Sequence, residues 1–259
     1  MTLLASIYEQ QREDAEVVLV DQNEDDRISA LLKTMPFRLN LKYLRSREKG
    51  PSAARNLGMD AAQGAILAFP DDDCWYPSGL LHHVDIWFDL HPKYAVLAVG
   101  ARDDQGVSSG NRWFQNACDI SPLNALRTTF CSSLFIAAGE RGRSVRFDPK
   151  LFRAEETDFV LRVLATGLRG RFDRSLYVHH PRRDMLSGTV STARAISYGH
   201  GMGYLVRRHS LYLLWVALLA YDLGRAVVVS LRGRLRDAGF CFAHARGLFV
   251  GFVFESTHE

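Results

Sequence analysis

Three consecutive aspartates, Asp71, Asp72 and Asp73, follow a short apolar run and have the clearest chemistry in this chain. Adjacent carboxylates repel one another and raise one another's pKa unless a cation offsets their charge. Hard oxygen ligands suit Mg²⁺ or Mn²⁺, which bind through one or two carboxylates and complete their coordination with substrate phosphate oxygens. The triplet therefore predicts a divalent-metal site. Solvated acids that cap a helix before Pro77 are the alternative interpretation.

The elements that would position these acids alternate between strand and helix. Apolar or alternating runs predict strands, and apolar residues at helical spacing predict helices. The predicted strands cover residues 17–20, 37–44, 65–69, 94–100, 131–138 and 171–181, and the predicted helices cover residues 3–11, 28–35, 52–62, 80–90 and 155–166. This order indicates an α/β fold with a mainly parallel sheet flanked by helices, in which ligands bind outside the carboxyl ends of the strands. Asp21 and the aspartate triplet both fall at such ends.

The composition is that of a globular protein. Of the 259 residues, 47% are hydrophobic and 24% are charged. This profile excludes disordered, collagen-like and small disulfide-stapled proteins. The four cysteines form no CxxC pair, so neither a zinc knuckle nor a disulfide framework is indicated. The N-terminal segment has no secretion-signal pattern, and a reducing, cytoplasmic setting is favoured.

The net charge of +3 is unevenly distributed along the chain. Residues 1–200 carry 25 Lys and Arg against 25 Asp and Glu, whereas residues 201–259 carry 7 Arg against 4 acids. So small a surplus predicts no nucleic-acid partner, because such a partner needs a domain-wide basic face. This excess of basic residues distinguishes residues 201–259 from the rest of the chain.

The C-terminal tail, residues 206–259, combines apolar and basic character. Residues 211–221 carry no charge, and the apolar run continues to about residue 231 with two charged residues inside it. Charges near the middle disfavour a spanning helix, which needs roughly 20 predominantly apolar residues. Three arginines follow at once, namely Arg232, Arg234 and Arg236. The pattern favours a helical tail bound peripherally to the anionic inner face of the cell membrane. A buried core helix with a basic solvated face is the alternative.

Two runs of residues resemble a known family. Gly50-Pro-Ser-Ala-Ala-Arg-Asn-Leu-Gly58 and then Phe69-Pro-Asp-Asp-Asp-Cys-Trp-Tyr-Pro77 are similar to the ARNxG helix and the DxD-type acid motif of family 2 glycosyltransferases of GT-A fold. The resemblance continues at residues 17–22, at the acid-rich segment 155–162, at the pair His179-His180 and at residues 198–203, and covers about residues 3–210. It implies a GT-A-like domain over residues 1–205, followed by the tail.

The resemblance implies a role for each matching residue. Asp21 would accept a hydrogen bond from the base of the nucleotide, and Arg55 would contact the nucleotide. Asp73 would ligate Mn²⁺ or Mg²⁺ at the diphosphate, and His180 would add a metal or diphosphate contact, although the histidine pair leaves open which ring faces the site. The implied nucleotide-binding residues are Asp21, Arg55, Asp71 and Asp72, and the implied metal ligands are Asp73, Asp71 and His180.

The resemblance also implies a base on the acceptor side. Glycosyl transfer with inversion needs one base to take the proton of the acceptor hydroxyl while the nucleotide leaves from the opposite face. Glu156 stands where the family commonly has its catalytic aspartate, and Glu155 is the second candidate. The implied activity is an inverting, metal-dependent transfer of a sugar from a UDP-linked donor to a hydroxyl of a lipid-linked or polysaccharide acceptor of the cell envelope.

The start of the chain differs from that of the family. Family members begin with an apolar strand and a loop that forms one wall of the base pocket, whereas this chain begins with the helix pattern of residues 3–11. We therefore expect either a natural start upstream of Met1 or an incomplete pocket. In the second case the chain would be a truncated, non-catalytic GT-A domain that serves as a binding or assembly module. A metal-dependent phosphohydrolase is a third interpretation, which leaves the ARNxG helix without a role.

Overall fold

The chain folds into two compact units. Unit 1 comprises residues 1–147 and 159–182, and unit 2 comprises residues 148–158 and 183–259. The structure, a computed structural model, describes residues 2–108, 116–126, 128, 130, 132–137, 139–151, 153–181 and 192–254. The last part of the predicted tail, residues 255–259, lies outside these. Each unit is considered by itself below.

The strands all belong to unit 1. They are β1 (Glu16–Asp21), β2 (Asn40–Arg45), β3 (Ile66–Ala68), β4 (Tyr94–Arg102), β5 (Cys118–Asp119), β6 (Leu134–Ala137) and β7 (Arg169–His179). The helices between them are α1 (Thr2–Tyr8), α2 (Arg27–Lys33), α3 (Pro51–Ala61), α4 (Leu80–Leu90), α5 (Pro122–Ala125), α6 (Glu140–Ser144) and α7 (Glu155–Ala165), whose first four residues are counted with unit 2. Helices α8 (Thr192–Arg208), α9 (Tyr212–Leu231) and α10 (Leu235–Val253) belong to unit 2.

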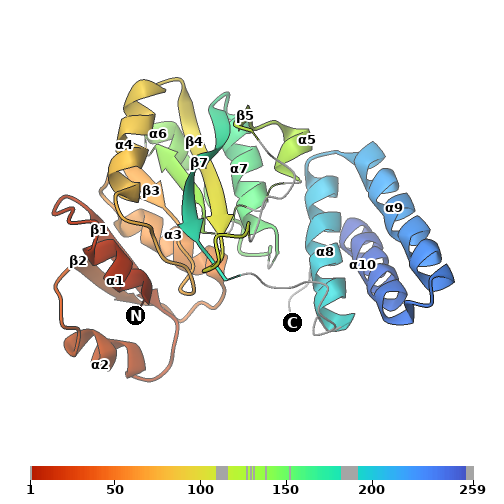
Figure 1. Ribbon diagram of the computed structural model, residues 1–259, viewed down its shortest axis with the longest axis horizontal. Coiled ribbons are helices and arrows are strands. Elements are labelled where there is room, and N and C mark those ends of the chain that lie inside the picture. The colour runs from red at the N-terminus through yellow and green to blue at the C-terminus, as the bar shows by residue number, and fades with distance from the viewer. Residues whose placement is uncertain are drawn as a thin grey trace. The chain divides into compact units, whose positions relative to one another are not determined.

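The described residues of unit 1 form two sheets (Figure 1). One has two strands, β1 and β2, and the other has five strands in the order β3-β6-β4-β7-β5. The pairs β1–β2 and β4–β7 are parallel, whereas β3–β6, β4–β6 and β5–β7 are antiparallel. The five-stranded sheet is therefore mixed, because β6 is inserted antiparallel between β3 and β4. The expected α/β class is observed, with a smaller parallel share than the strand–helix alternation predicts.

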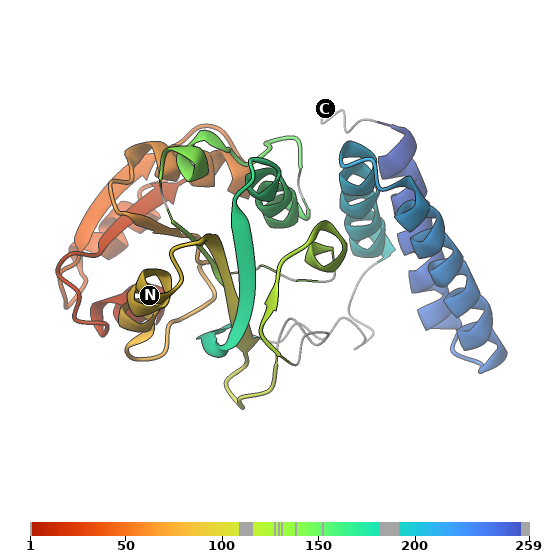
Figure 2. The same cartoon turned by 90° about the horizontal axis from the view of Figure 1, so that it is seen from above.

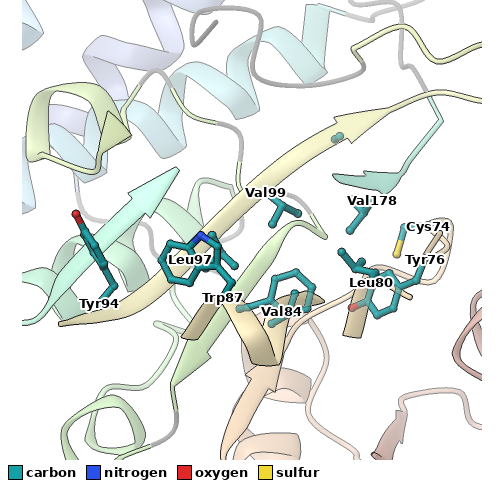
Figure 3. Close-up of a cluster of buried hydrophobic side chains, with 11 residues drawn as sticks. Cys74, Tyr76, Leu80, Val84, Trp87, Tyr94, Leu97, Val99 and Val178 are labelled. Carbon is teal, nitrogen blue, oxygen red and sulfur yellow. The ribbon is translucent and has the colours of Figure 1, made fainter. Parts of the chain in front are cut away.

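The core of unit 1 lies between α4 and the five-stranded sheet. The residues of α4 that face the sheet follow helical spacing, with Leu80, Val84 and Trp87 all buried. Figure 3 shows these side chains gathered against Leu97 and Val99 of β4. Burying apolar side chains of this size stabilises the fold by about 1.5–3 kcal/mol each. The predicted helix over residues 80–90 is confirmed.

Unit 2 is built around an unusually close pair of helices. Helices α8 and α10 lie side by side, with α9 next to them (Figure 2). A Cβ added at Gly203 of α8 would overlap the backbone carbonyl of Leu248 on α10. A Cβ added at Gly247 of α10 would overlap that of Ile196 on α8. Glycine is required at these positions because the two backbones touch. Helix α8 thus packs with the tail helices, although the sequence places the domain boundary after residue 205.

Two glycine substitutions are expected to change stability in opposite directions. Gly247→Ala forces the backbones of α8 and α10 apart, and overpacking of this kind costs about 3 kcal/mol. Gly224→Ala on α9 adds a methyl group where nothing lies within 4 Å. It should stabilise the helix by about 0.5–1 kcal/mol, because glycine is entropically unfavourable in a helix interior. Urea unfolding of both variants measures the difference, and equal effects would contradict the close packing.

Candidate active site

The aspartate triplet lies in a loop that is fastened to the end of β7. The backbone N–H of Trp75 donates to the carbonyl of His179 (3.0 Å), and the N–H of His179 donates to the carbonyl of Trp75 (2.8 Å). The two side-chain rings stack with centroids 5.1 Å apart. The N–H of His180 in turn donates to the carbonyl of Arg102 at the end of β4 (2.8 Å). These bonds hold His180 beside the loop that follows β3.

Asp71, Asp73 and His180 come together as a candidate metal site. One ligand atom from each lies within 4.8 Å of the other two. Nε2 of His180 is 3.4 Å from Oδ1 of Asp73 and 3.9 Å from Oδ2 of Asp71. The two carboxylates are about one-third exposed, whereas the imidazole is buried. The site is thus open to a ligand on its carboxylate side. Asp72 is exposed and outside this group of ligand atoms.

The hydrogen bonding of His180 fits a metal ligand. Its Nδ1 lies 2.9 Å from the carbonyl oxygen of Pro181. A carbonyl only accepts, so Nδ1 donates this hydrogen bond, and Nε2 is the ring nitrogen that faces the two carboxylates. A hydrogen bond from the second ring nitrogen to a backbone carbonyl is the usual support of a metal-bound histidine. Two carboxylates and one imidazole suit a divalent cation such as Mn²⁺ or Mg²⁺.

Cys74 contributes no ligand to this site although it stands inside the acidic loop. Its side chain is fully buried, and burial raises the pKa of the thiol to about 12. Cys74 lies outside the group of candidate ligand atoms, which consists of carboxylate oxygens and one imidazole nitrogen.

Helix α3 brings Arg55 to the same site. Nη2 of Arg55 donates to Oδ1 of Asp71 at 3.0 Å, and the guanidinium is largely buried. The neighbouring Asn56 binds both the N–H and the carbonyl of Phe147, at 2.8 and 2.9 Å. These two hydrogen bonds fix the turn of α3 that carries Arg55. The sequence pattern includes Asn56 without assigning it this role.

Asp21 ends β1 as predicted, but its carboxylate is already engaged. The side chain is 2% exposed. Its Oδ1 accepts hydrogen bonds from the backbone and side chain of Asn23 at 2.8 and 2.6 Å, and its Oδ2 accepts from the hydroxyl of Tyr43 at 2.6 Å. The bond from Tyr43 lowers the pKa of Asp21 despite the opposing effect of burial. Tyr43 was not among the residues predicted from the sequence. The parallel register of β1 and β2, which pairs Leu19 with Tyr43, is the feature that would have identified Tyr43 as a partner of Asp21.

The Tyr43→Phe variant is expected to raise the pKa of Asp21. A carboxyl group with a lowered folded-state pKa stabilises the fold above its unfolded pKa of about 3.9, and loses that contribution as the pH falls through the folded value. The variant should therefore be less stable than the native chain at pH 7, and the gap should shrink below about pH 4. NMR titration of the Asp21 carboxyl carbon measures the shift. An unchanged pKa would show that Tyr43 does not govern this group.

Glu155 and Glu156 lie in the first turn of α7, and their segment is anchored within unit 2. Asp158, in the same turn, is completely buried. Its Oδ1 is 3.0 Å from Nε2 of His209 and 3.2 Å from Nε of Arg208. Because a buried carboxylate needs such partners, the end of α8 holds the start of α7 in place. The two glutamates are therefore carried by a fixed turn.

Gly201 of α8 provides a second anchor for this turn. A Cβ at Gly201 would lie 2.7 Å from the carbonyl oxygen of Arg153, so only glycine lets the chain before α7 come this close. Ala154 follows with φ +63°, a conformation that costs a residue with a side chain about 1–2 kcal/mol. The glycines at residues 199–203 thus serve packing.

Comparison with known proteins agrees with this architecture. Residues 2–145, more than half of the chain, match the family model described as Glycosyl transferase family 2. The minor teichoic acid biosynthesis protein GgaB of Bacillus subtilis is 24% identical over 191 residues. This match covers 71% of the present chain and 21% of GgaB. The chain thus spans a small part of that relative.

Two solved structures are similar in fold. S. aureus TarS in complex with UDP-GlcNAc has a TM-score of 0.59 at 22% identity, and the match covers 79% of this chain and 60% of that one. The mannosyltransferase PcManGT from Pyrobaculum calidifontis, in complex with GDP-Man and Mn²⁺, has a TM-score of 0.65 at 18% identity and covers 95% of this chain and 81% of that one. The α/β fold of GT-A type is thereby confirmed.

Proposed function

The chain belongs to glycosyl transferase family 2, and on this premise we propose that it moves a sugar from a nucleotide-linked donor to a hydroxyl group of a glycan or lipid-linked acceptor. The observation that carries the proposal is the group formed by Asp71, Asp73 and His180, with Arg55 bound to Asp71. Two carboxylates after β3, an imidazole after β7 and a guanidinium on α3 come together here, and this set suits a bound diphosphate and its cation.

Asp71 and Asp73 would hold Mn²⁺ or Mg²⁺, and His180 would complete the protein's share of the ligands. Such a cation supplies charge stabilisation to the departing diphosphate. Arg55 restrains Asp71 and offers a fixed positive fork to the nucleotide. Asp21 and Asp72 remain proposed nucleotide contacts. For Asp21 to bind the base, the hydroxyl of Tyr43 must share or release its oxygen.

The transfer proceeds with inversion in this proposal. The acceptor oxygen forms a bond to the anomeric carbon while the bond from that carbon to the diphosphate oxygen breaks. The electron pair of the breaking bond leaves with the nucleoside diphosphate. Glu156 takes the proton of the acceptor hydroxyl, and Glu155 is the second candidate for this role. Both lie in the first turn of α7.

A UDP-linked donor and a cell-envelope acceptor are the proposed substrates. The TarS neighbour binds UDP-GlcNAc, whereas the mannosyltransferase neighbour binds GDP-Man, so both donor types enter the test. GgaB is named for teichoic acid biosynthesis, which supports a cell-wall polymer as acceptor. The alternative is a GT-A domain that binds nucleotide without catalysis and serves as an assembly module.

The deciding experiment offers the full chain UDP-GlcNAc, UDP-glucose or GDP-mannose together with purified teichoic acid and Mn²⁺ or Mg²⁺. Release of the nucleoside diphosphate should require both acceptor and metal, and NMR of the product should show an inverted anomeric configuration. Nucleotide binding without transfer from any donor would favour the non-catalytic module. Transfer with retention of configuration would contradict the assigned mechanism.

A further inference from the structure

Helix α9 presents a continuous apolar face to solvent. It has 20 residues. Over its most apolar 18-residue window the mean hydropathy is 1.7, and 17% of this window is buried. Its exposed residues recur at helical spacing and include no charged side chain. We call this face the apolar stripe, formed by Leu213, Val216, Ala217, Ala220, Leu223, Gly224, Val227 and Leu231. Leu213 is 88% exposed and Leu231 is 83% exposed, so the stripe runs from one end of the helix to the other.

The two charges of α9 lie away from this stripe. Asp222 is buried, and its carboxylate is 2.6 Å from Nδ1 of His244 on α10. Arg225 is half-buried, so neither of the two charges is among the exposed residues of α9. They leave the stripe free of charge.

A basic turn closes the stripe at its C-terminal end. We define it as Arg232 and Arg234, which lie between α9 and α10, together with Arg236 in the first turn of α10; all three are exposed. Arg234 pairs with Asp237. Within the described part of the chain, Arg232 and Arg236 have no ion-pair partner. Unpaired guanidinium groups beside an exposed apolar surface match the anionic headgroups and acyl boundary of a lipid membrane.

We propose that unit 2 binds an anionic lipid surface, with the apolar stripe of α9 lying in the membrane interface and the basic turn on the phosphate groups. A flat orientation follows from the packing of the unit. If α9 crossed the bilayer, α10 would carry Arg236, Asp237 and Arg246 with it, and charges in hydrocarbon are costly. If α9 lies parallel to the membrane surface, only the apolar stripe enters the hydrocarbon region. This inference does not depend on the proposed transferase activity.

Co-sedimentation of the full chain with liposomes tests the surface without any sugar donor. Binding to phosphatidylglycerol vesicles should exceed binding to pure phosphatidylcholine and should weaken from 0.1 to 0.5 M NaCl. Each arginine near an anionic surface contributes about fivefold in affinity, so changing all three to glutamine should cost about 100-fold. Changing all three to lysine keeps the charge and should preserve most of the binding.

The stripe has its own matched variants. Leu213→Asp and Val227→Asp alter side chains that are 88% and 56% exposed, so both should fold and lose vesicle binding. Leu90→Asp is the control, because Leu90 is 72% exposed on α4 of unit 1 and should leave binding unchanged. A native chain that ignores anionic vesicles would overturn the proposal. So would a lipid-free dimer, seen by sedimentation velocity, that dissociates when the stripe is changed, since a second copy would then cover this face.

The depth of nitroxide labels in the bilayer reports the orientation of α9. Nitroxide labels at Leu213→Cys, Ala220→Cys and Val227→Cys should show similar, shallow depths in anionic bilayers, with the labelled native chain as background. A depth that increases toward the bilayer centre at residue 220 and decreases on both sides would indicate a spanning helix and contradict the flat orientation. Labels that remain in water would contradict stripe insertion altogether.

Discussion

The Asp73→Ala variant is expected to lose metal-dependent nucleotide binding and to lower turnover by roughly 10²–10³-fold, the usual cost of removing one preorganised electrostatic contact to developing charge. Oδ1 of Asp73 is the carboxylate atom nearest to Nε2 of His180, at 3.4 Å. Its removal would leave Asp71, which already accepts a hydrogen bond from Arg55, as the remaining carboxylate of the group. One carboxylate shared with a guanidinium holds a divalent cation poorly.

Calorimetric titration of UDP, with Mn²⁺ and with EDTA, measures the effect on binding. The native chain should bind UDP more tightly with Mn²⁺, and the variant should bind equally weakly in both conditions. Asp89→Asn is the matched control, since Asp89 is an exposed acid on α4 outside the ligand group. Metal-independent binding of UDP by the native chain, or an unaltered Asp73→Ala variant, would show that the aspartates do not serve a cation.

The acidic half of this site could be predicted from the sequence because its signal is local. An apolar strand followed directly by aspartates places carboxylates at a sheet edge, and β3 ends at Ala68 just before them. The choice between His179 and His180 could not be made locally. It depends on the bridge between Trp75 and His179, which stacks one ring against the indole and leaves the other facing the carboxylates.

Contacts between distant segments explain the other differences. The sequence marks Asp21 as a strand-end acid, but the bond from Tyr43 depends on the parallel register of β1 and β2. Residues 134–137 read as a strand, yet no local pattern states that β6 would run antiparallel between β3 and β4. Local periodicity predicts elements, whereas strand order is decided by packing.

The helices of the tail also show that local sequence patterns predict elements and do not predict how these elements pack. In the sequence, Asp222 and Arg225 interrupt an apolar run and argue against a helix that spans the membrane. Whether these two side chains are exposed depends on which face of α9 packs against α10. That face is set by the close contact of α8 with α10. Because the glycines that permit this contact lie in two segments far apart in the chain, neither segment alone predicts the pairing.

The Glu156→Gln variant should lower turnover by roughly 10²–10⁴-fold, the contribution of a positioned general base. Glutamine has nearly the same shape and cannot take the proton of the acceptor hydroxyl. UDP affinity should stay nearly unchanged, because the substitution removes a proton acceptor and no proposed nucleotide contact.

Three companion measurements separate this role from a structural one. Glu155→Gln changes the neighbouring acid of the same turn and should retain most of the turnover, whereas loss there and not at residue 156 would move the base by one position. Glu156→Asp keeps a carboxylate, and aspartate is the residue that the family commonly has here, so partial activity is expected. Unfolding curves of the three variants check that each one folds, and the contacts of Asp158 with Arg208 and His209 in the same turn are present in all of them. If neither glutamine variant slows transfer, proton removal does not pass through this helix, and the acid-rich start of α7 serves only to carry the buried Asp158.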